Sequence, residues 1–135
     1  MNVNSFSGIP LVQLLSDGRS IKLAAPFSFA DTEGVYTAPT NFISNGANNP
    51  RILWPLIGSP LVGKHRWAAI IHDWLCYEKK LPWQRVHKIY YSACVAAGVD
   101  EALAKDYYVA LMAFGPRWDK NGNPLKTVEP DYISF

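Results

Sequence analysis

The stretch from about residue 61 to residue 116 constrains the fold most, because its apolar residues recur every three to four positions. This is the period of an amphipathic helix. Pro82, Gly98 and the pair Gly115–Pro116 interrupt it, and helices commonly begin or end at Pro and Gly. The spacing predicts a helical core of three helices, over residues 66–79, 83–97 and 100–114.

The first 60 residues show short apolar runs separated by turn residues instead. Asp17–Gly18 stands between two such runs, and Asp-Gly in this position is a strong hairpin signal because Gly accepts a positive φ. Residues 39–60 are dense in Asn, Gly and Pro, which predicts a loop. The strands expected from this pattern cover residues 11–15, 21–23, 27–29 and 35–37.

Together these patterns predict an α+β protein. A small antiparallel β-hairpin or sheet portion and an Asn/Pro-rich loop precede the three-helix core. A chain of 135 residues is one domain's worth of protein. We therefore expect a single domain over 1–135, with strands and loops in 1–60, the helical core in 61–116, and a turn and C-terminal tail in 117–135.

The charge balance excludes a protein that binds nucleic acid mainly through charge. The net charge is +2, from 13 Lys and Arg against 11 Asp and Glu, and no basic block is present to neutralise a run of phosphates. No apolar stretch approaches the roughly 20 residues of a membrane-spanning helix, and residues 1–10 show no secretory signal. Two cysteines do not make a disulfide scaffold, so Cys76 and Cys94 are expected as buried free thiols.

The dipeptide His72–Asp73 on the first expected helix is the main chemical candidate. An imidazole serves as a general base when a third group orients it, and an aspartate is a ligand for a hard cation such as Ca²⁺. The structural alternative is a core histidine bonded to a backbone carbonyl, with Asp73 in solvent. Spacing alone favours this alternative, because a His-Asp dipeptide is common.

His87, on the second expected helix, is the next candidate. A short connection makes the first two helices pack antiparallel, so His87 can face His72 at a similar depth. With Asp73, the two histidines form a set suited to Zn²⁺ or a similar metal. The alternative, favoured by the basic residues on either side, is an exposed His87. His65, among basic residues at a helix start, is expected at the surface.

Several sequence blocks occur in an order and spacing that resemble one family. Residues 38–54 read A-P-T-N-F-I-S-N-G-A-N-N-P-R-I-L-W and residues 68–75 read A-A-I-I-H-D-W-L. Residues 86–90, V-H-K-I-Y, and 114–118, F-G-P-R-W, follow the later blocks. Over residues 35–118 the chain resembles an uncharacterised phage and prophage family, a domain of unknown function (DUF1353-like).

The core of that family is in turn similar in pattern to the helix pair of secreted and parvoviral phospholipases A2. In those enzymes a His-Asp pair supplies a general base and a Ca²⁺ ligand. An Asp on the neighbouring helix orients the His, and a Gly-rich loop completes the calcium site. The resemblance implies His72 as base, Asp73 as metal ligand and His87 as orienting partner. It also implies that the loop with Asn45, Gly46 and Asn48 faces them.

This chain departs from the family pattern at the polar positions. Asn45 stands where the family has a loop Asp, Asn48 where it has a loop Ser, and His87 where it has the second-helix Asp. Losing two carboxylates weakens a Ca²⁺ site, because ligand charge helps set the affinity. Either the site has changed to a softer metal held by His72 and His87, or catalysis has been lost and the scaffold kept.

The resemblance therefore implies, first, a virion-associated structural or interaction protein of a phage, in the tail, baseplate or tail tip, with a degenerate hydrolase-like site. Its partners are then other phage structural proteins, with an oligomer in the particle. It is made in the host cytoplasm and located in the virion. The alternatives are a metal-dependent phospholipase A2-like or envelope hydrolase using Ca²⁺ or Zn²⁺, and a soluble phage protein that binds a host factor.

Overall fold

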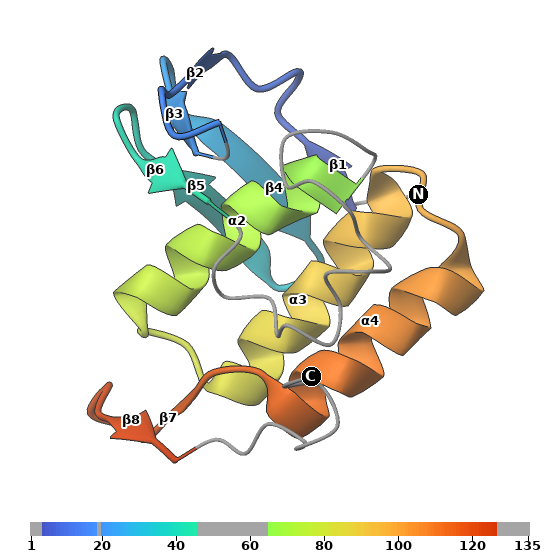
Figure 1. Cartoon of the computed structure of the whole chain (residues 1–135). Helices are drawn as coiled ribbons and strands as arrows, with labels where there is room; N and C mark the ends of the chain where they lie inside the picture. Colours follow the sequence, from blue (N-terminus) through green and yellow to red (C-terminus); the bar gives the residue numbers. More distant parts are fainter. Residues whose placement is uncertain (1–3, 19, 46–64, 127–135) are drawn as a thin grey trace.

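The computed structural model describes residues 4–18, 20–45 and 65–126 (Figure 1). The described part is an α+β structure, as predicted, with small antiparallel sheets ahead of three helices. The N-terminal strands are β1 (Ser5–Phe6), β2 (Val12–Leu14), β3 (Ile21–Leu23), β4 (Phe27–Asp31), β5 (Gly34–Ala38) and β6 (Ile43–Ser44). The helices are α2 (His65–Glu78), α3 (Trp83–Ala96) and α4 (Glu101–Phe114), followed by strands β7 (Arg117–Trp118) and β8 (Pro124–Leu125).

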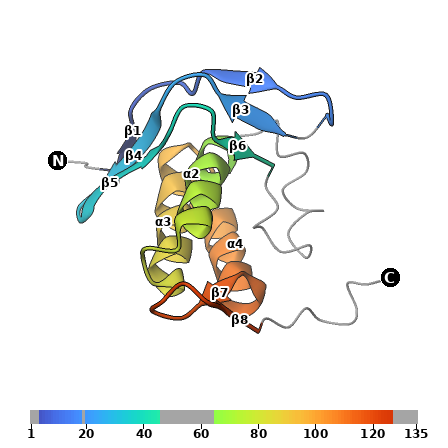
Figure 2. The same cartoon turned by 90° about the vertical axis from the view of Figure 1, so that its left-hand side faces the viewer.

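The N-terminal strands pair in two antiparallel sheets, ordered β1–β4–β5 and β2–β3–β6. The predicted hairpin at Asp17–Gly18 is confirmed, since it joins β2 to β3 and Gly18 has a φ of 75°. Asp17 stabilises this turn by accepting a hydrogen bond of 2.8 Å from the backbone N–H of Ser20. Figure 2 shows the strands as a layer across one end of the helices. The two sheets therefore cap the helical core.

The three helices begin and end within one residue of their predicted limits. α2 and α3 run antiparallel after a connection of four residues, 79–82, and α4 packs on α3 (Figure 1). The side chain of Asp100 accepts the backbone N–H of Leu103 at 3.3 Å, which satisfies one of the free N–H groups at the start of α4. No helix among these residues is long and apolar enough to cross a membrane.

An aromatic cluster fixes the sheets on the helices. Phe27 and Phe29 of β4 are fully buried, and Phe6 of β1 stacks on Phe27 with ring centroids 5.4 Å apart. Trp67 of α2 meets Phe6 edge-on, also at 5.4 Å. Each large apolar side chain buried in this way contributes about 1.5–3 kcal/mol. This cluster holds α2 against β4.

Three segments differ from the prediction. Strand β1 is not among the expected strands. Ile43–Ser44 falls in the expected loop 39–60 but pairs with β3, Ser44 opposite Ile21, while residues 46–60 lie outside the described residues. In the expected tail, the turn at Asn121–Gly122 is confirmed, but it joins β7 and β8 in a hairpin. Strands of two residues carry no alternating pattern, so sequence periodicity does not show them.

Candidate functional site

His72 and His87 lie face to face between α2 and α3. His72 Nε2 is 3.0 Å from His87 Nδ1, and both side chains are 0 % exposed. The alternative of an exposed His87 is therefore wrong. The antiparallel packing after a short connection brings the two residues together, as the sequence argument expected.

The hydrogen bonds of the pair decide which nitrogens carry protons. His87 Nε2 lies 2.9 Å from the carbonyl oxygen of Pro116, which can only accept, so His87 donates from Nε2. In a neutral His87, Nδ1 is then the acceptor, and His72 donates to it from Nε2. The remaining nitrogen of a neutral His72, Nδ1, carries a lone pair. The three groups form one directed chain, from His72 through His87 to Pro116.

Burial keeps both imidazoles neutral near pH 7. Burial lowers the pKa of His72 well below its ordinary value, and the neighbouring His87 lowers it further. Burial also lowers the pKa of His87 to about 4, and although the bond to Pro116 raises it, the charge of Arg117 lowers it. Two neutral rings are the protonation state that the directed chain requires.

The rest of the His72 ring is enclosed by side chains of the two helices. The ring of Tyr90 lies 4.9 Å from it, between centroids. Cys76 Sγ is 3.6 Å from Nε2 and 3.9 Å from Nδ1 of His72. Because these distances are nearly equal, the sulfur lies off the axis of the lone pair on Nδ1. Burial raises the pKa of the Cys76 thiol, so it stays protonated.

Asp73 has a different partner from His72. Its Oδ2 accepts a hydrogen bond of 2.6 Å from the hydroxyl of Ser44, and both residues are buried. The alternative of a solvated Asp73 is therefore wrong. Asn45, next to Ser44, is exposed. Gly46 and Asn48 lie outside the described residues, so their place in the predicted loop near the site stays a prediction.

Two members of this arrangement were not singled out from the sequence. Ser44 stands inside the first family block, where its position 29 residues before Asp73 gave no signal of contact. Pro116 was recognised only as a helix stop. Gly115 before it is required by close packing, since a Cβ there would lie 2.5 Å from the oxygen of Leu111 and 3.1 Å from His87 Nε2.

His65 is also placed differently from the expectation. It was predicted at the surface, but it begins α2 with 5 % of its side chain exposed. The basic residues beside it in sequence suggested solvent, whereas His65 lies beside the α3–α4 connection and Tyr107 of α4. By contrast, the predicted burial of Cys76 and Cys94 as free thiols is confirmed.

The described residues do not assemble a complete metal site. Within 4–18, 20–45 and 65–126, no group of three or more His, Cys, Asp or Glu is placed to hold a metal ion. The facing nitrogens of His72 and His87 bond to each other, and Asp73 bonds to Ser44. Ca²⁺ or Zn²⁺ held by His72, Asp73 and His87 stays a prediction.

Comparison with known proteins places the chain in a family. It is 35 % identical over 117 residues to the uncharacterized protein y4iH of Sinorhizobium fredii (strain NBRC 101917 / NGR234), which covers 85 % of this chain and 49 % of that protein. It is 34 % identical over 117 residues to the uncharacterized protein y4jT of the same strain, covering 84 % of this chain and 35 % of that protein.

This chain therefore spans about half or less of the length of these two relatives. No solved structure matches it significantly. The model of the family described as "Protein of unknown function (DUF1353)" matches residues 21–111 of this chain. That region contains Ser44, both helices of the histidine pair and most of α4. The chain belongs to the DUF1353 family.

Proposed function

We propose that this domain is a structural and interaction component of a phage or prophage particle, located in the virion and made in the host cytoplasm. In this proposal the His72–His87 pair serves the fold and not a reaction. The observation that supports this scaffold role is the complete burial of both imidazoles in a hydrogen-bond chain that ends on the Pro116 carbonyl.

This burial argues against general-base catalysis. A general base has to come within hydrogen-bond distance of the proton that it removes from the substrate. The free lone pair of His72 is on Nδ1, in a ring that is 0 % exposed and enclosed by Tyr90 and Cys76. The buried bonds from His72 to His87 and from His87 to Pro116 instead specify one packing of the two helices.

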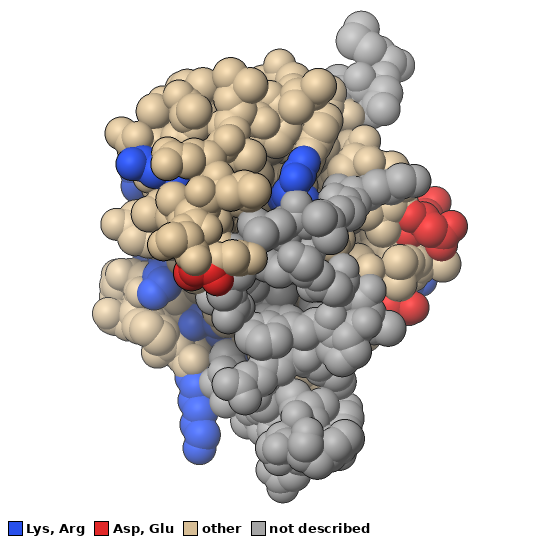
Figure 3. Space-filling model, turned by 45° about the horizontal axis from the view of Figure 1, so that its top comes forward, with Lys and Arg blue, Asp and Glu red and all other residues tan. Residues whose placement is uncertain are grey.

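The place in a particle rests on the resemblance to a family found in phage and prophage genomes. The surface is compatible with contacts to other structural proteins, in the tail, baseplate or tail tip. Ile9, Leu11 and Leu14, around β2, are all more than 60 % exposed. Figure 3 shows that the described surface at this end of the molecule is mostly uncharged. Exposed apolar side chains at one end of the molecule are suited to such contacts.

The test is to detect the protein in purified particles. Particles are induced from a lysogen that carries the gene, purified by density gradient, and probed with an antibody against the recombinant chain. A band that copurifies with particles supports the proposal. Enrichment in the cell lysate with none in the particles refutes it, and favours the alternative of a soluble phage protein that binds a host factor.

A second candidate function is a phospholipase A2-like or envelope hydrolase. One observation favours it: His87 on the neighbouring helix binds His72 Nε2 and leaves Nδ1 unprotonated, as an orienting partner does. Chelator-treated protein is titrated with Ca²⁺ and with Zn²⁺ by calorimetry, and then assayed on phospholipid micelles. Metal binding and turnover that are both lost in His72→Ala favour this candidate. If neither Ca²⁺ nor Zn²⁺ binds, the result supports the scaffold role.

A further inference from the structure

An open pocket of about 430 Å³ lies on the outer side of α2, away from the histidine pair. Residues 39–43, leading into β6, form one wall, and Trp74 and Tyr77 of α2 form the other. Its size is within the range of small-molecule sites, roughly 300–1,000 Å³. None of the residues that line it is charged.

Three aromatic rings form an ordered platform in this pocket. Phe42 meets Trp74 edge-on, with ring centroids 5.2 Å apart and an interplanar angle of 76°. Trp74 in turn stacks on Tyr77, with centroids 5.7 Å apart and an angle of 25°. Tyr77 is 73 % exposed. A broad ring face is therefore presented to solvent while its neighbours hold it in place.

Polar groups stand beside this platform. Thr40, which carries a hydroxyl, and Asn41, which carries a side-chain amide, are among the residues that line the pocket. The backbone of Asn41 is fixed, because its N–H donates to the carbonyl of Leu23 at 2.8 Å and its φ is 74°. This left-handed conformation is one that Asn tolerates better than most residues. Asn41 thus stands in the pocket lining on a backbone that is held in place.

We infer that this pocket binds a neutral sugar ring of an oligosaccharide. A pyranose has an apolar face of C–H groups that packs on an aromatic ring, and hydroxyls at its edge that need amide and hydroxyl partners. The aromatic face of Tyr77 with Asn41 and Thr40 offers both. A charged ligand would lose hydration here without gaining an ionic partner, which costs free energy.

The inference goes beyond the proposed function. All residues that line the pocket come from one chain, so sugar binding does not depend on whether the protein is part of a particle. The experiment uses the purified full chain. An array of neutral hexose and N-acetylhexosamine oligosaccharides, with sialylated and uronate-containing glycans for comparison, identifies the best ligand. Calorimetric titration with that oligosaccharide then compares the wild type with variants, each checked for folding by circular dichroism.

The variants separate the ring from the polar groups. We expect Tyr77→Ala to lower affinity at least about tenfold, and Tyr77→Phe, which keeps the ring, to stay within about threefold. Asn41→Gly removes the amide but keeps a backbone that accepts the positive φ, so it should weaken binding several-fold. Val109→Ala, an exposed apolar residue on α4, is the matched control and should bind as the wild type does.

Three results overturn the inference. The first is no binding of any neutral oligosaccharide up to about 10 mM. The second is a Tyr77→Ala variant that binds as tightly as the wild type. The third is a wild-type dimer in sedimentation velocity that Tyr77→Ala converts to monomer, which would make this pocket a contact between copies of the chain.

Discussion

Replacing His87 with Leu tests whether the directed chain of hydrogen bonds stabilises the fold. The substitution leaves two polar groups without their partner, the buried Nε2–H of His72 and the part-buried carbonyl of Pro116. Each such group costs about 1–3 kcal/mol. The more apolar Leu side chain offsets part of this by better burial. We expect a loss of about 3 kcal/mol in the free energy of unfolding.

The assay is urea unfolding followed by circular dichroism. At a typical slope of about 2 kcal/mol per M, the midpoint moves down by about 1.5 M. His87→Asn is the matched control, because its Oδ1 can still accept from His72 Nε2 and only the bond to Pro116 is lost. The free energy of unfolding of His87→Asn should fall between that of the wild type and that of His87→Leu.

A double mutant isolates the bond between the two rings. His72→Leu removes the donor to His87, and the pair of Leu substitutions leaves only the Pro116 carbonyl without a partner. The double variant should therefore be less destabilised than the sum of the two single variants, by about 1–3 kcal/mol. A loss below about 1 kcal/mol in His87→Leu, or strict additivity, would refute the reasoning.

Three further predictions rest on the pKa of His87, the packing of Gly115 and the cap of α4. Because the pKa of His87 falls from about 6.5 unfolded to about 4 folded, the unfolded chain binds more protons between these values. His87 alone should then lower the free energy of unfolding by about 3 kcal/mol from pH 6.5 to 4. His72, whose pKa is also lowered, adds to this drop, so His87→Leu should reduce the pH dependence without abolishing it. Gly115→Ala should cost about 2 kcal/mol in chemical denaturation, since its Cβ meets backbone; an unchanged midpoint would contradict the packing. Asp100→Ala should cost about 1 kcal/mol by thermal unfolding, through loss of the α4 cap, whereas Asp100→Asn should keep most of it.

The helices were predictable because their limits are set by local chemistry. Asp100 caps α4, and Gly98, with a φ of 98°, follows the end of α3. The facing of His72 and His87 followed from the short connection alone. Long-range pairings were harder, because the partners of Ser44 and Pro116 depend on how separate elements pack. A two-residue strand such as β6 carries too few side chains for a pattern.

The burial of His87 was missed because its neighbours in sequence are basic. Arg85 and Lys88 lie two positions and one position from His87, so neither shares its buried face of α3. Arg85 donates to the hydroxyl of Tyr36 and pairs with Glu33 of the β4–β5 turn. Lys88 Nζ lies 5.2 Å from the ring centroid of Tyr91. On a helix, residues three or four positions away share a face, so Trp83 and Tyr90 were the better guides to His87.

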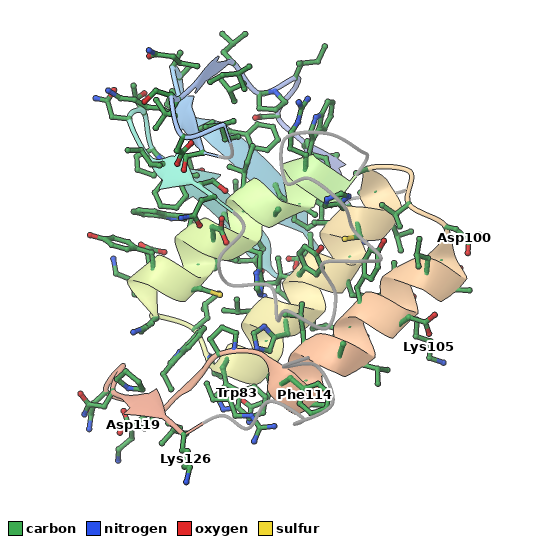
Figure 4. All side chains as sticks on the ribbon, in the orientation of Figure 1. Trp83, Asp100, Lys105, Phe114, Asp119 and Lys126 are labelled. Atoms are coloured by element: carbon green, nitrogen blue, oxygen red, sulfur yellow. The ribbon has the colours of Figure 1, made fainter. Side chains whose placement is uncertain are left out.

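The β7–β8 hairpin after α4 packs against the connection between α2 and α3. This packing limits where the chain can be truncated. Besides the bond from His87 to Pro116, Trp118 donates to the carbonyl of Leu81 at 2.7 Å, and Arg117 lies 4.8 Å over the ring of Trp83. Figure 4 shows Trp83 beside the segment that carries Asp119 and Lys126.

The match to the family model ends at residue 111, before Pro116, Arg117 and Trp118. A fragment trimmed to the matched region would lose the acceptor for His87 and the indole that covers the helix junction, as well as Phe6 at the other end. The contacts that close the helix junction therefore extend beyond the region that the family model matches. A truncated or fused version of this chain should keep about fifteen residues beyond residue 111 to include this hairpin.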